Sequence, residues 1–103
     1  MFRSTITVIS PTLTFSTPED FILELSNYFD VNGYNDAINN YEISNKILNK
    51  VETLINSKTL TTIIDWDSED SYNEFYINSI HYPTYISSLE DAGYIRNVVV
   101  EII

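Results

Sequence analysis

The sequence predicts a single α+β domain over residues 1–103, and three observations support this fold class. Residues 2–10 and 95–103 are rich in β-branched side chains, which favours a strand near each end. Residues 59–66, "TLTTIIDW", place Leu60, Ile64 and Trp66 on one face of a third strand. Two helix-start signals lie between these strands. A length of 103 residues and an apolar fraction of 44% suit one domain with one core.

The first helix is predicted to begin after Thr17, because "TPED" at 17–20 combines an N-cap, a proline at the first helical position and two acids in the first turn. Helical spacing then predicts one buried face, formed by Phe21, Ile22, Leu25, Tyr28 and Phe29. Gly33 is expected to end this helix.

The second helix is predicted to begin after Ser68, with Glu69 and Asp70 in its first turn. Its buried face is expected to contain Tyr72, Phe75, Tyr76 and Ile80. Pro83 interrupts the pattern, and residues 84–94 add one or two more turns. The run of valines in "IRNVVVEII" at 95–103 predicts a central strand that is covered on both sides.

Residues 42–57 fit both a helix and a strand. Apolar side chains fall there at helical spacing, at Ile43, Ile47, Leu48, Val51, Leu54 and Ile55. As a strand, every second position from 47 to 55 would be only half apolar. Periodicity by itself therefore predicts a helix.

Composition excludes several classes of function. Fifteen acidic and five basic residues give a net charge of −10, which disfavours direct binding to nucleic acid. No apolar run is long enough to cross a membrane. The absence of cysteine excludes disulfides, thiolate zinc sites and a thiol nucleophile. Ile, Asn and Tyr are abundant and have A/T-rich codons, which indicates an A/T-rich genome such as many phages have.

The segment "DWDSEDSYNE" at 65–74 forms an acidic cluster of five carboxylates, Asp65, Asp67, Glu69, Asp70 and Glu74. The first three have the spacing of a calcium loop, but Asp70 stands where the loop needs glycine and Tyr76 where it needs the closing glutamate. A strand end followed by a capped helix start accounts for these acids, so we expect no metal site.

No catalytic or cofactor-binding set stands out either. His81 is the single histidine, and the two glycines form no phosphate-binding loop. The eight tyrosines on a small acidic domain favour a protein interface. Its candidate residues are Trp66, Tyr72, Tyr76, Tyr82 and Tyr85.

The segment "LTTIIDWDSEDSYNEFYINS" at 60–79 resembles the antibiotic-biosynthesis-monooxygenase-like family of dimeric α/β barrels. The matching positions are Trp66, Asp67, Ser68, Glu69, Asp70, Tyr72, Asn73 and Phe75. The resemblance implies a ferredoxin-like βαββαβ fold with a four-stranded antiparallel sheet, helices on one face and dimers formed by packing two sheets. It also implies a strand at 46–55, joined to 59–66 by a turn at 56–58.

The resemblance does not carry catalytic residues to this chain. Enzymes of the haem-degrading branch of the family use a Trp on the second helix and a His later in the chain. Their positions fall on Phe75 and Tyr85, and the first strand, "STITVIS", lacks the family's Asn.

We therefore expect a non-catalytic phage-type protein, a virion component or accessory factor in the virion or host cytoplasm. It would act through contacts with phage or host proteins and as a homo-oligomer. One alternative is a cofactor-free monooxygenase or haem-binding enzyme of the dimeric α/β barrel type. Another is an acidic DNA mimic that inhibits a host nucleic-acid-binding protein.

Overall fold

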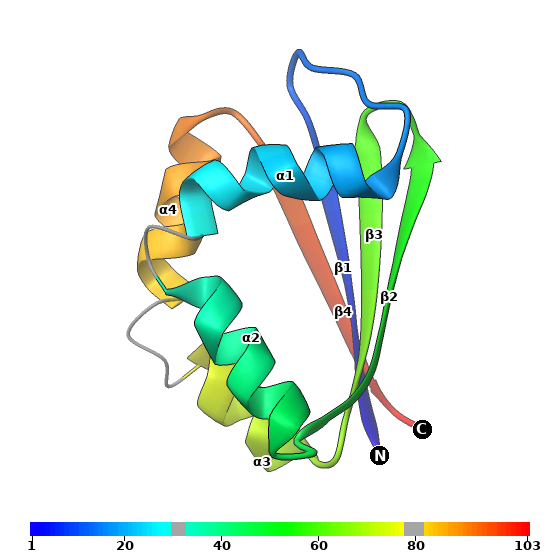
Figure 1. Cartoon of the computed structure of the whole chain (residues 1–103), viewed down its shortest axis with the longest axis vertical. Helices are drawn as coiled ribbons and strands as arrows, with labels where there is room; N and C mark the ends of the chain where they lie inside the picture. Colours follow the sequence, from blue (N-terminus) through cyan, green and yellow to red (C-terminus); the bar gives the residue numbers. More distant parts are fainter. Residues whose placement is uncertain (30–32, 78–81) are drawn as a thin grey trace.

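The computed structural model describes residues 1–29, 33–77 and 82–103, and it has the predicted α+β ferredoxin-like fold. Four strands form one antiparallel sheet in the order β2-β3-β1-β4. The described helices lie together on one face of this sheet (Figure 1). In chain order the elements are β1 (Phe2–Ile9), α1 (Pro18–Phe29), α2 (Tyr34–Ile43), β2 (Ile47–Asn56), β3 (Thr59–Trp66), α3 (Glu69–Tyr72), the π-helix η2 (Asn73–Ile77), α4 (Tyr82–Asp91) and β4 (Ile95–Ile102).

The ambiguous residues 42–57 contain the last two residues of helix α2 and all of strand β2. The predicted strand at 46–55 is confirmed, because β2 pairs antiparallel with β3 over almost its whole length. Its pairs include Val51 with Ile63 and Leu54 with Leu60. β2 is an edge strand, so its half-apolar pattern is sufficient, and cross-strand pairing outweighs the helical period. The predicted order did not include helix α2.

Strand β4 is the other edge of the sheet, so its predicted central position is wrong. It pairs only with β1. Its valines alternate between the two faces, with Val98 packed against the core and Val99 66% exposed. A strand can carry apolar residues on both faces without a neighbouring strand on both edges. The run of valines therefore did not establish a central position for β4.

The core lies between the sheet and the helices. Strand β1 alternates strictly, with Phe2, Ser4, Ile6 and Val8 buried toward the helices. Trp66, at the end of β3, is fully buried, and its indole N–H donates to Ser4 Oγ at 3.0 Å. Four rings surround this indole at centroid distances of 5.5 to 6.2 Å, those of Tyr41, Tyr72, Phe75 and Tyr76. Each such ring pair adds about 0.5–1.5 kcal/mol beyond its burial.

Both predicted helix starts are confirmed by their caps. Thr17 Oγ1 accepts a hydrogen bond from Asp20 N–H at 3.2 Å, and Ser68 Oγ accepts one from Ser71 N–H at 3.2 Å. The second helix is less regular than predicted, because α3 widens into a π-helix at Asn73. Gly93 has the left-handed φ of 89° after α4, which suits a helix C-terminus. The predicted positions of Ile80 and His81 lie outside the described residues.

Candidate functional site

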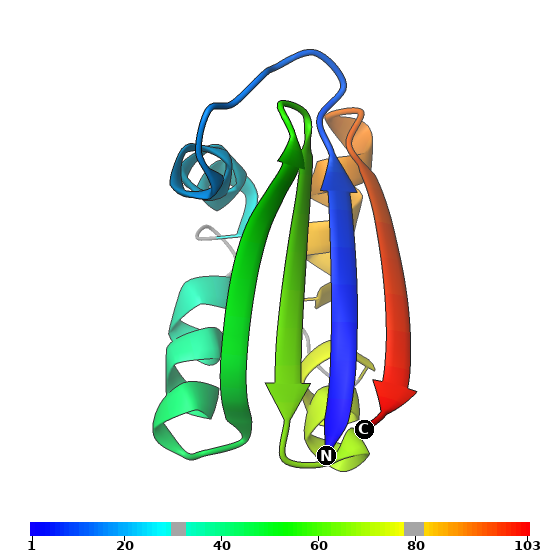
Figure 2. The same ribbon diagram turned by 90° about the vertical axis from the view of Figure 1, so that its right-hand side faces the viewer.

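One face of the sheet carries none of the helices that the structure describes. It is the face turned toward the viewer in Figure 2, where the described helices lie behind the strands. Residues paired across neighbouring strands share a face, so the register defines the side chains of this outer face row by row. A central polar row contains Thr53, Thr61, Thr7 and Asn97. The next row contains Val51, Ile63, Thr5 and Val99.

The outer face has a second apolar row and one charged row. On the other side of the polar row lie Ile9 and Ile95, followed at the β3 and β2 end by Thr59 and Asn56. Val51, Ile95 and Val99 are 47%, 56% and 66% exposed, which leaves large β-branched surface in contact with solvent. A charged row at the far end contains Asn49, Asp65, Arg3 and Glu101. The outer face therefore combines apolar and hydroxyl rows with one charged end.

The charged end is ordered by a two-pronged ion pair. Arg3 Nε donates to Asp65 Oδ1 at 2.7 Å, and Arg3 Nη2 donates to Asp65 Oδ2 at 3.1 Å. Asp65 is buried, and the hydrogen bonds and charge of Arg3 hold its pKa below the usual range although burial opposes this. The pair places two opposite charges on the outer face in a mutually neutralising arrangement.

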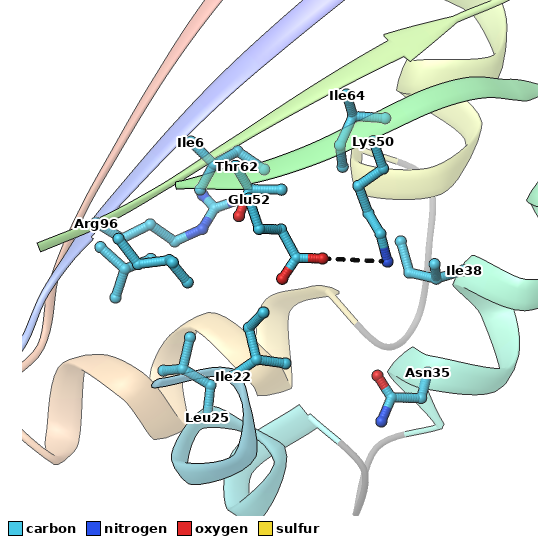
Figure 3. A pocket seen from close by; sticks show the side chains of 12 residues that line it. Ile6, Ile22, Leu25, Asn35, Ile38, Lys50, Glu52, Thr62, Ile64 and Arg96 are labelled. Carbon is cyan, nitrogen blue, oxygen red and sulfur yellow. Dashed lines mark ion pairs between the residues drawn. The ribbon is translucent and has the colours of Figure 1, made fainter. Parts of the chain in front are cut away.

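The opposite face of the sheet contains a partly open cavity of about 80 Å³ between the strands and helices α1 and α2 (Figure 3). Most of its wall is aliphatic, with contributions from Ile6, Val8, Leu60 and Ile64 of the sheet and from Ile22, Leu25 and Ile38 of the helices. Asn35, Lys50, Glu52, Thr62 and Arg96 supply the polar part of the lining. The described lining residues include no His, Cys, Ser or Tyr.

The charged side chains of the cavity come from both edge strands. Lys50 Nζ lies 3.6 Å from Glu52 Oε1 and 3.9 Å from Glu42 Oε1, which are ion-pair distances but longer than hydrogen bonds. Figure 3 shows the Glu52 carboxylate in the space between the sheet and α1. On the β4 side, the Arg96 guanidinium lies over the ring of Tyr76, 5.7 Å from its centroid. The π-helix that carries Tyr76 thus contacts the β4 side of the cavity.

The five acids of the predicted cluster have separate surroundings. Asp65 pairs with Arg3 on the outer face, whereas Asp67 accepts a hydrogen bond from Ser68 Oγ at 3.2 Å. Glu69 and Asp70 lie exposed in the first turn of α3. Among the residues that the structure describes, no three His, Cys, Asp or Glu side chains gather closely enough to hold a metal ion.

Glu74 forms a contact that the sequence did not indicate. It accepts a hydrogen bond from Tyr41 Oη at 2.6 Å and one from Lys46 Nζ at 3.3 Å. The hydrogen bond from Tyr41 and the bond and charge of Lys46 lower the pKa of Glu74. Burial and the bond to Glu74 raise the pKa of Tyr41 above its ordinary value. This contact ties α2 to η2, and nothing in the spacing of the two residues predicted it.

Of the predicted interface residues, the three whose side chains the structure describes lie wholly or partly inside the protomer. Trp66 and Tyr76 are almost completely buried, so their rings serve the core and offer no surface to a partner in this conformation. Tyr72 is half-buried and packs on Phe2, with ring centroids 5.2 Å apart. The side chains of Tyr82 and Tyr85 lie outside the described residues. A strand–turn–helix corner with many aromatics is explained here by core packing.

No protein-family model matches the sequence, and no curated protein matches it. Solved structures do. A protein from Deinococcus radiodurans with the provisional name antibiotic biosynthesis monooxygenase superposes with a TM-score of 0.67 at 9% identity, covering 100% of this chain and 92% of that one. A dimeric ferredoxin-like protein from an uncultured marine organism gives 0.64 at 12% identity, with 100% and 94% covered.

A third structure, of an antibiotic biosynthesis monooxygenase, gives a TM-score of 0.58 at 13% identity and covers 100% of this chain and 98% of that one. The chain has the fold of these proteins. This confirms the predicted ferredoxin-like architecture over the whole length. In the region that the structure describes, no helix has the length and apolar character required to span a bilayer.

Proposed function

We propose that this protein is a non-catalytic homodimer that works through protein–protein contacts, and that its two protomers join through the helix-free outer face of the sheet. The observation that carries the proposal is the row of Val51, Ile63, Thr5 and Val99, which runs across all four strands with none of the described helices over it. Exposed β-branched rows are the surface that sheets bury when they pack face to face, about 10 Å apart.

The area of the outer face suits this role. Four neighbouring strands of about eight residues each form a sheet of about 26 Å by 19 Å, which is about 500 Å² per protomer. Two such faces bury about 1,000 Å², which is the lower limit of a specific interface. A similarly folded protein is described as dimeric, which supports a homo-oligomer.

The charges of the outer face are compatible with burial in a dimer. Arg3 and Asp65 already neutralise each other through two hydrogen bonds, so an approaching sheet meets a compensated pair. Glu101 lies beside Arg3 in the register and adds one acid at the rim. The rest of the outer face is uncharged in its central rows.

Sedimentation equilibrium of the purified chain tests the dimer. We expect a dimer for the wild type and a monomer for Ile63→Glu, because a carboxylate in the middle of a packed apolar row is left without a partner. The matched control is Leu23→Glu, which adds the same charge at a 70% exposed position on α1 and should leave the dimer intact. A monomeric wild type, or equal dissociation by both variants, contradicts the proposal.

The non-catalytic part rests on the chemistry of the cavity. Its described lining offers aliphatic walls, one Thr, one Asn and three charged side chains, and it includes no His, Cys, Ser or Tyr. We expect no Soret shift on titration with haem and no turnover of quinol substrates in the presence of oxygen. Turnover of a quinol would replace this proposal with the monooxygenase hypothesis.

We further propose that the protein belongs to a phage, as a virion component or accessory factor in the virion or host cytoplasm. The support is compositional, since the favoured residues Ile, Asn and Tyr have A/T-rich codons. Mass spectrometry of purified virions tests this directly. Detection at fixed stoichiometry identifies a virion component, and detection only in infected cells identifies an accessory factor.

A further inference from the structure

The two edges of the sheet differ in how they are protected against further strand pairing. An edge strand exposes a row of backbone N–H and C=O groups, and proteins commonly protect it with bulges and charged side chains. The pairing of β2 with β3 is interrupted at Leu48 and again at Ile55, and Lys50 and Glu52 lie between the two interruptions. The pairing of β4 with β1 continues without a break over Ile95–Ile102. The β4 edge therefore keeps the regular geometry that another strand requires.

The hydrogen bonds of β4 define which of its backbone groups face the open edge. Ile103 N–H donates to the Met1 carbonyl at 3.1 Å, which makes these residues a hydrogen-bonded pair of the β1–β4 ladder. Such pairs alternate along an antiparallel ladder, so the backbone groups of Val98, Val100 and Ile102 point away from β1. In the part of the chain that the structure describes, no strand pairs with that side of β4 (Figure 2).

The side chains along the open edge are apolar and poorly covered. Val100 and Ile102 are on the helix-covered face of the sheet, yet they are 46% and 83% exposed. Val99 on the outer face is 66% exposed. A further strand beside β4 would cover part of all three side chains.

We propose that β4 pairs antiparallel with β4 of a second copy, with Val99 at the two-fold axis. Opposite residues in an antiparallel pair share a face of the sheet, so only registers that match residues of the same face are possible. In the register centred on Val99, Val98 lies opposite Val100 of the second copy, and Val100 lies opposite Val98. The outward-facing N–H and C=O groups of both residues are then satisfied on both sides of the axis. The partner is a second copy because β4 is complementary to itself.

The charges of β4 are compatible with this pairing. The chain has a net charge of −10, but β4 contains one Arg and one Glu and is neutral as a strand. In the proposed register, Asn97 lies opposite Glu101 of the second copy, so an amide faces the carboxylate. The two Glu101 side chains stay about 13 Å apart along the strands, because four residues separate their positions.

The edge contact does not depend on the outer-face dimer. It involves one strand of each copy and is smaller than the outer-face contact, so we expect it at millimolar and not at micromolar protein concentration. Each outer-face dimer carries two β4 edges, so the wild type should form tetramers or larger assemblies as its concentration rises. Ile63→Glu, which is expected to be monomeric at micromolar concentration, should form the edge dimer at millimolar concentration.

Amide hydrogen exchange, measured by NMR on Ile63→Glu at the two concentrations, tests the edge contact. The amide protons of Val98 and Val100 should exchange at least tenfold more slowly at millimolar concentration. The amide of Val99 should change little, because it already bonds to β1. The wild type should show the same pattern, which provides the test should the variant fail to fold. Self-association that leaves the exchange of Val98 and Val100 unchanged overturns the proposal.

The register is tested by nuclear Overhauser spectra of a mixed sample of isotope-labelled and unlabelled protein. We expect a signal between the α protons of Asn97 and Glu101. These residues are about 13 Å apart within one strand, so the signal can come only from a second copy. Contacts between β4 strands in a different register overturn the assignment of Val99 to the axis.

Two variants with a matched change test the location. Ile102→Lys places a cation opposite Arg96 of the second copy and should weaken the edge contact at least tenfold. Ile43→Lys makes the same change at an 80% exposed position on α2 and should leave the contact intact. Both variants alter the net charge equally, so equal effects on self-association would contradict a contact at β4.

A proline variant tests the backbone pairing itself. Val100→Pro removes an N–H that points away from β1, so the β1–β4 ladder stays complete and only the edge contact should weaken. Val100→Thr keeps the N–H and the β-branched shape and should associate like the wild type. A folded Val100→Pro variant that associates as strongly as Val100→Thr overturns the proposal.

The results distinguish this contact from the outer-face dimer. A wild type that is dimeric at micromolar concentration, with fast exchange at Val98 and Val100 at millimolar concentration, retains the outer-face dimer and overturns the edge contact. Protection of these amides in a wild type that is monomeric at micromolar concentration supports the edge contact and contradicts the outer-face dimer. Protection that appears only after a different protein is added overturns self-pairing.

Discussion

The two faces of the sheet use the same strands in different ways. On the helix-covered face, Phe2, Ile6 and Val8 of β1 are each at most 6% exposed and belong to the same buried core as Trp66. On the outer face, Val51 and Val99 remain 47% and 66% exposed, and the polar groups include threonine hydroxyls, Asn97 and an ion pair. Alternation along a strand creates two faces, and only the helices decide which of them becomes the core of the protomer.

The largest expected effect is on the covered face. Trp66→Ala removes the ring at the centre of the aromatic cluster and leaves the Ser4 hydroxyl buried without its partner. We expect the free energy of unfolding to fall by about 3–5 kcal/mol, as measured by urea denaturation. Thr61→Ala on the outer face of the same strand is the control. An equally large fall in the free energy of unfolding for this variant would show that the two faces do not differ in their contribution to stability.

Two adjacent valines of β4 give a smaller and sharper comparison. Val98 packs against the core, so Val98→Thr buries a hydroxyl and should lower the free energy of unfolding by about 1 kcal/mol at low protein concentration. Val99→Thr should leave this value nearly unchanged and weaken dimerisation instead. Urea denaturation and sedimentation of both variants measure the two effects. If Val99→Thr lowers the stability and Val98→Thr weakens the dimer instead, the two faces are assigned the wrong way round.

The ion pair of the outer face predicts a dependence on pH. Because Arg3 lowers the folded-state pKa of Asp65, its contribution to stability is present above the unfolded pKa, which is about 3.9. It is lost as the pH falls through the lower folded-state pKa. We therefore expect Arg3→Met to be less stable than wild type at pH 7, with the difference shrinking below about pH 4. A difference that is constant from pH 7 to pH 2 would show that Arg3 acts by packing alone.

The smallest effect concerns the contact between α2 and η2. Tyr41 has a raised pKa because it is partly buried and donates to Glu74, so it should ionise at higher pH than an exposed tyrosine. In an ultraviolet titration, Tyr41→Phe should remove a late component, and Glu74→Gln should shift that component to lower pH. If Glu74→Gln leaves the titration unchanged, the raised pKa comes from burial alone.

Sequence reasoning reached the fold because its strongest signals are local. The caps at Thr17 and Ser68, the alternation of 59–66 and the Trp-containing corner all depend on neighbouring residues, and the structure contains each of them. The position of β4 at an edge was not predictable from its valines, because both a central strand and an edge strand with a bare apolar face produce that run. Strand β2 was reached only through the family resemblance, since its own period favours a helix.

The candidate site was harder to predict, because it depends on residues that are distant in the sequence. The outer face requires the register of four strands, and the cavity brings together Lys50 of β2, Arg96 of β4 and residues of α1 and α2. The aromatic surplus was assigned to an interface, yet Trp66 and Tyr76 are buried in the core. The exposed β-branched residues of the strands indicate the outer face better than the aromatic residues do. Their alternation along the strands was the sequence feature that could have predicted it.

A mixed sample of isotope-labelled and unlabelled protein tests the packing of the two outer faces most directly. Isotope-filtered nuclear Overhauser spectra of this sample detect only contacts between protomers. The account predicts contacts among the methyl groups of Val51, Ile63 and Val99 and those of a second copy. A dimer whose intermolecular contacts involve only helix residues, or a chain with no such contacts at millimolar concentration, would contradict it.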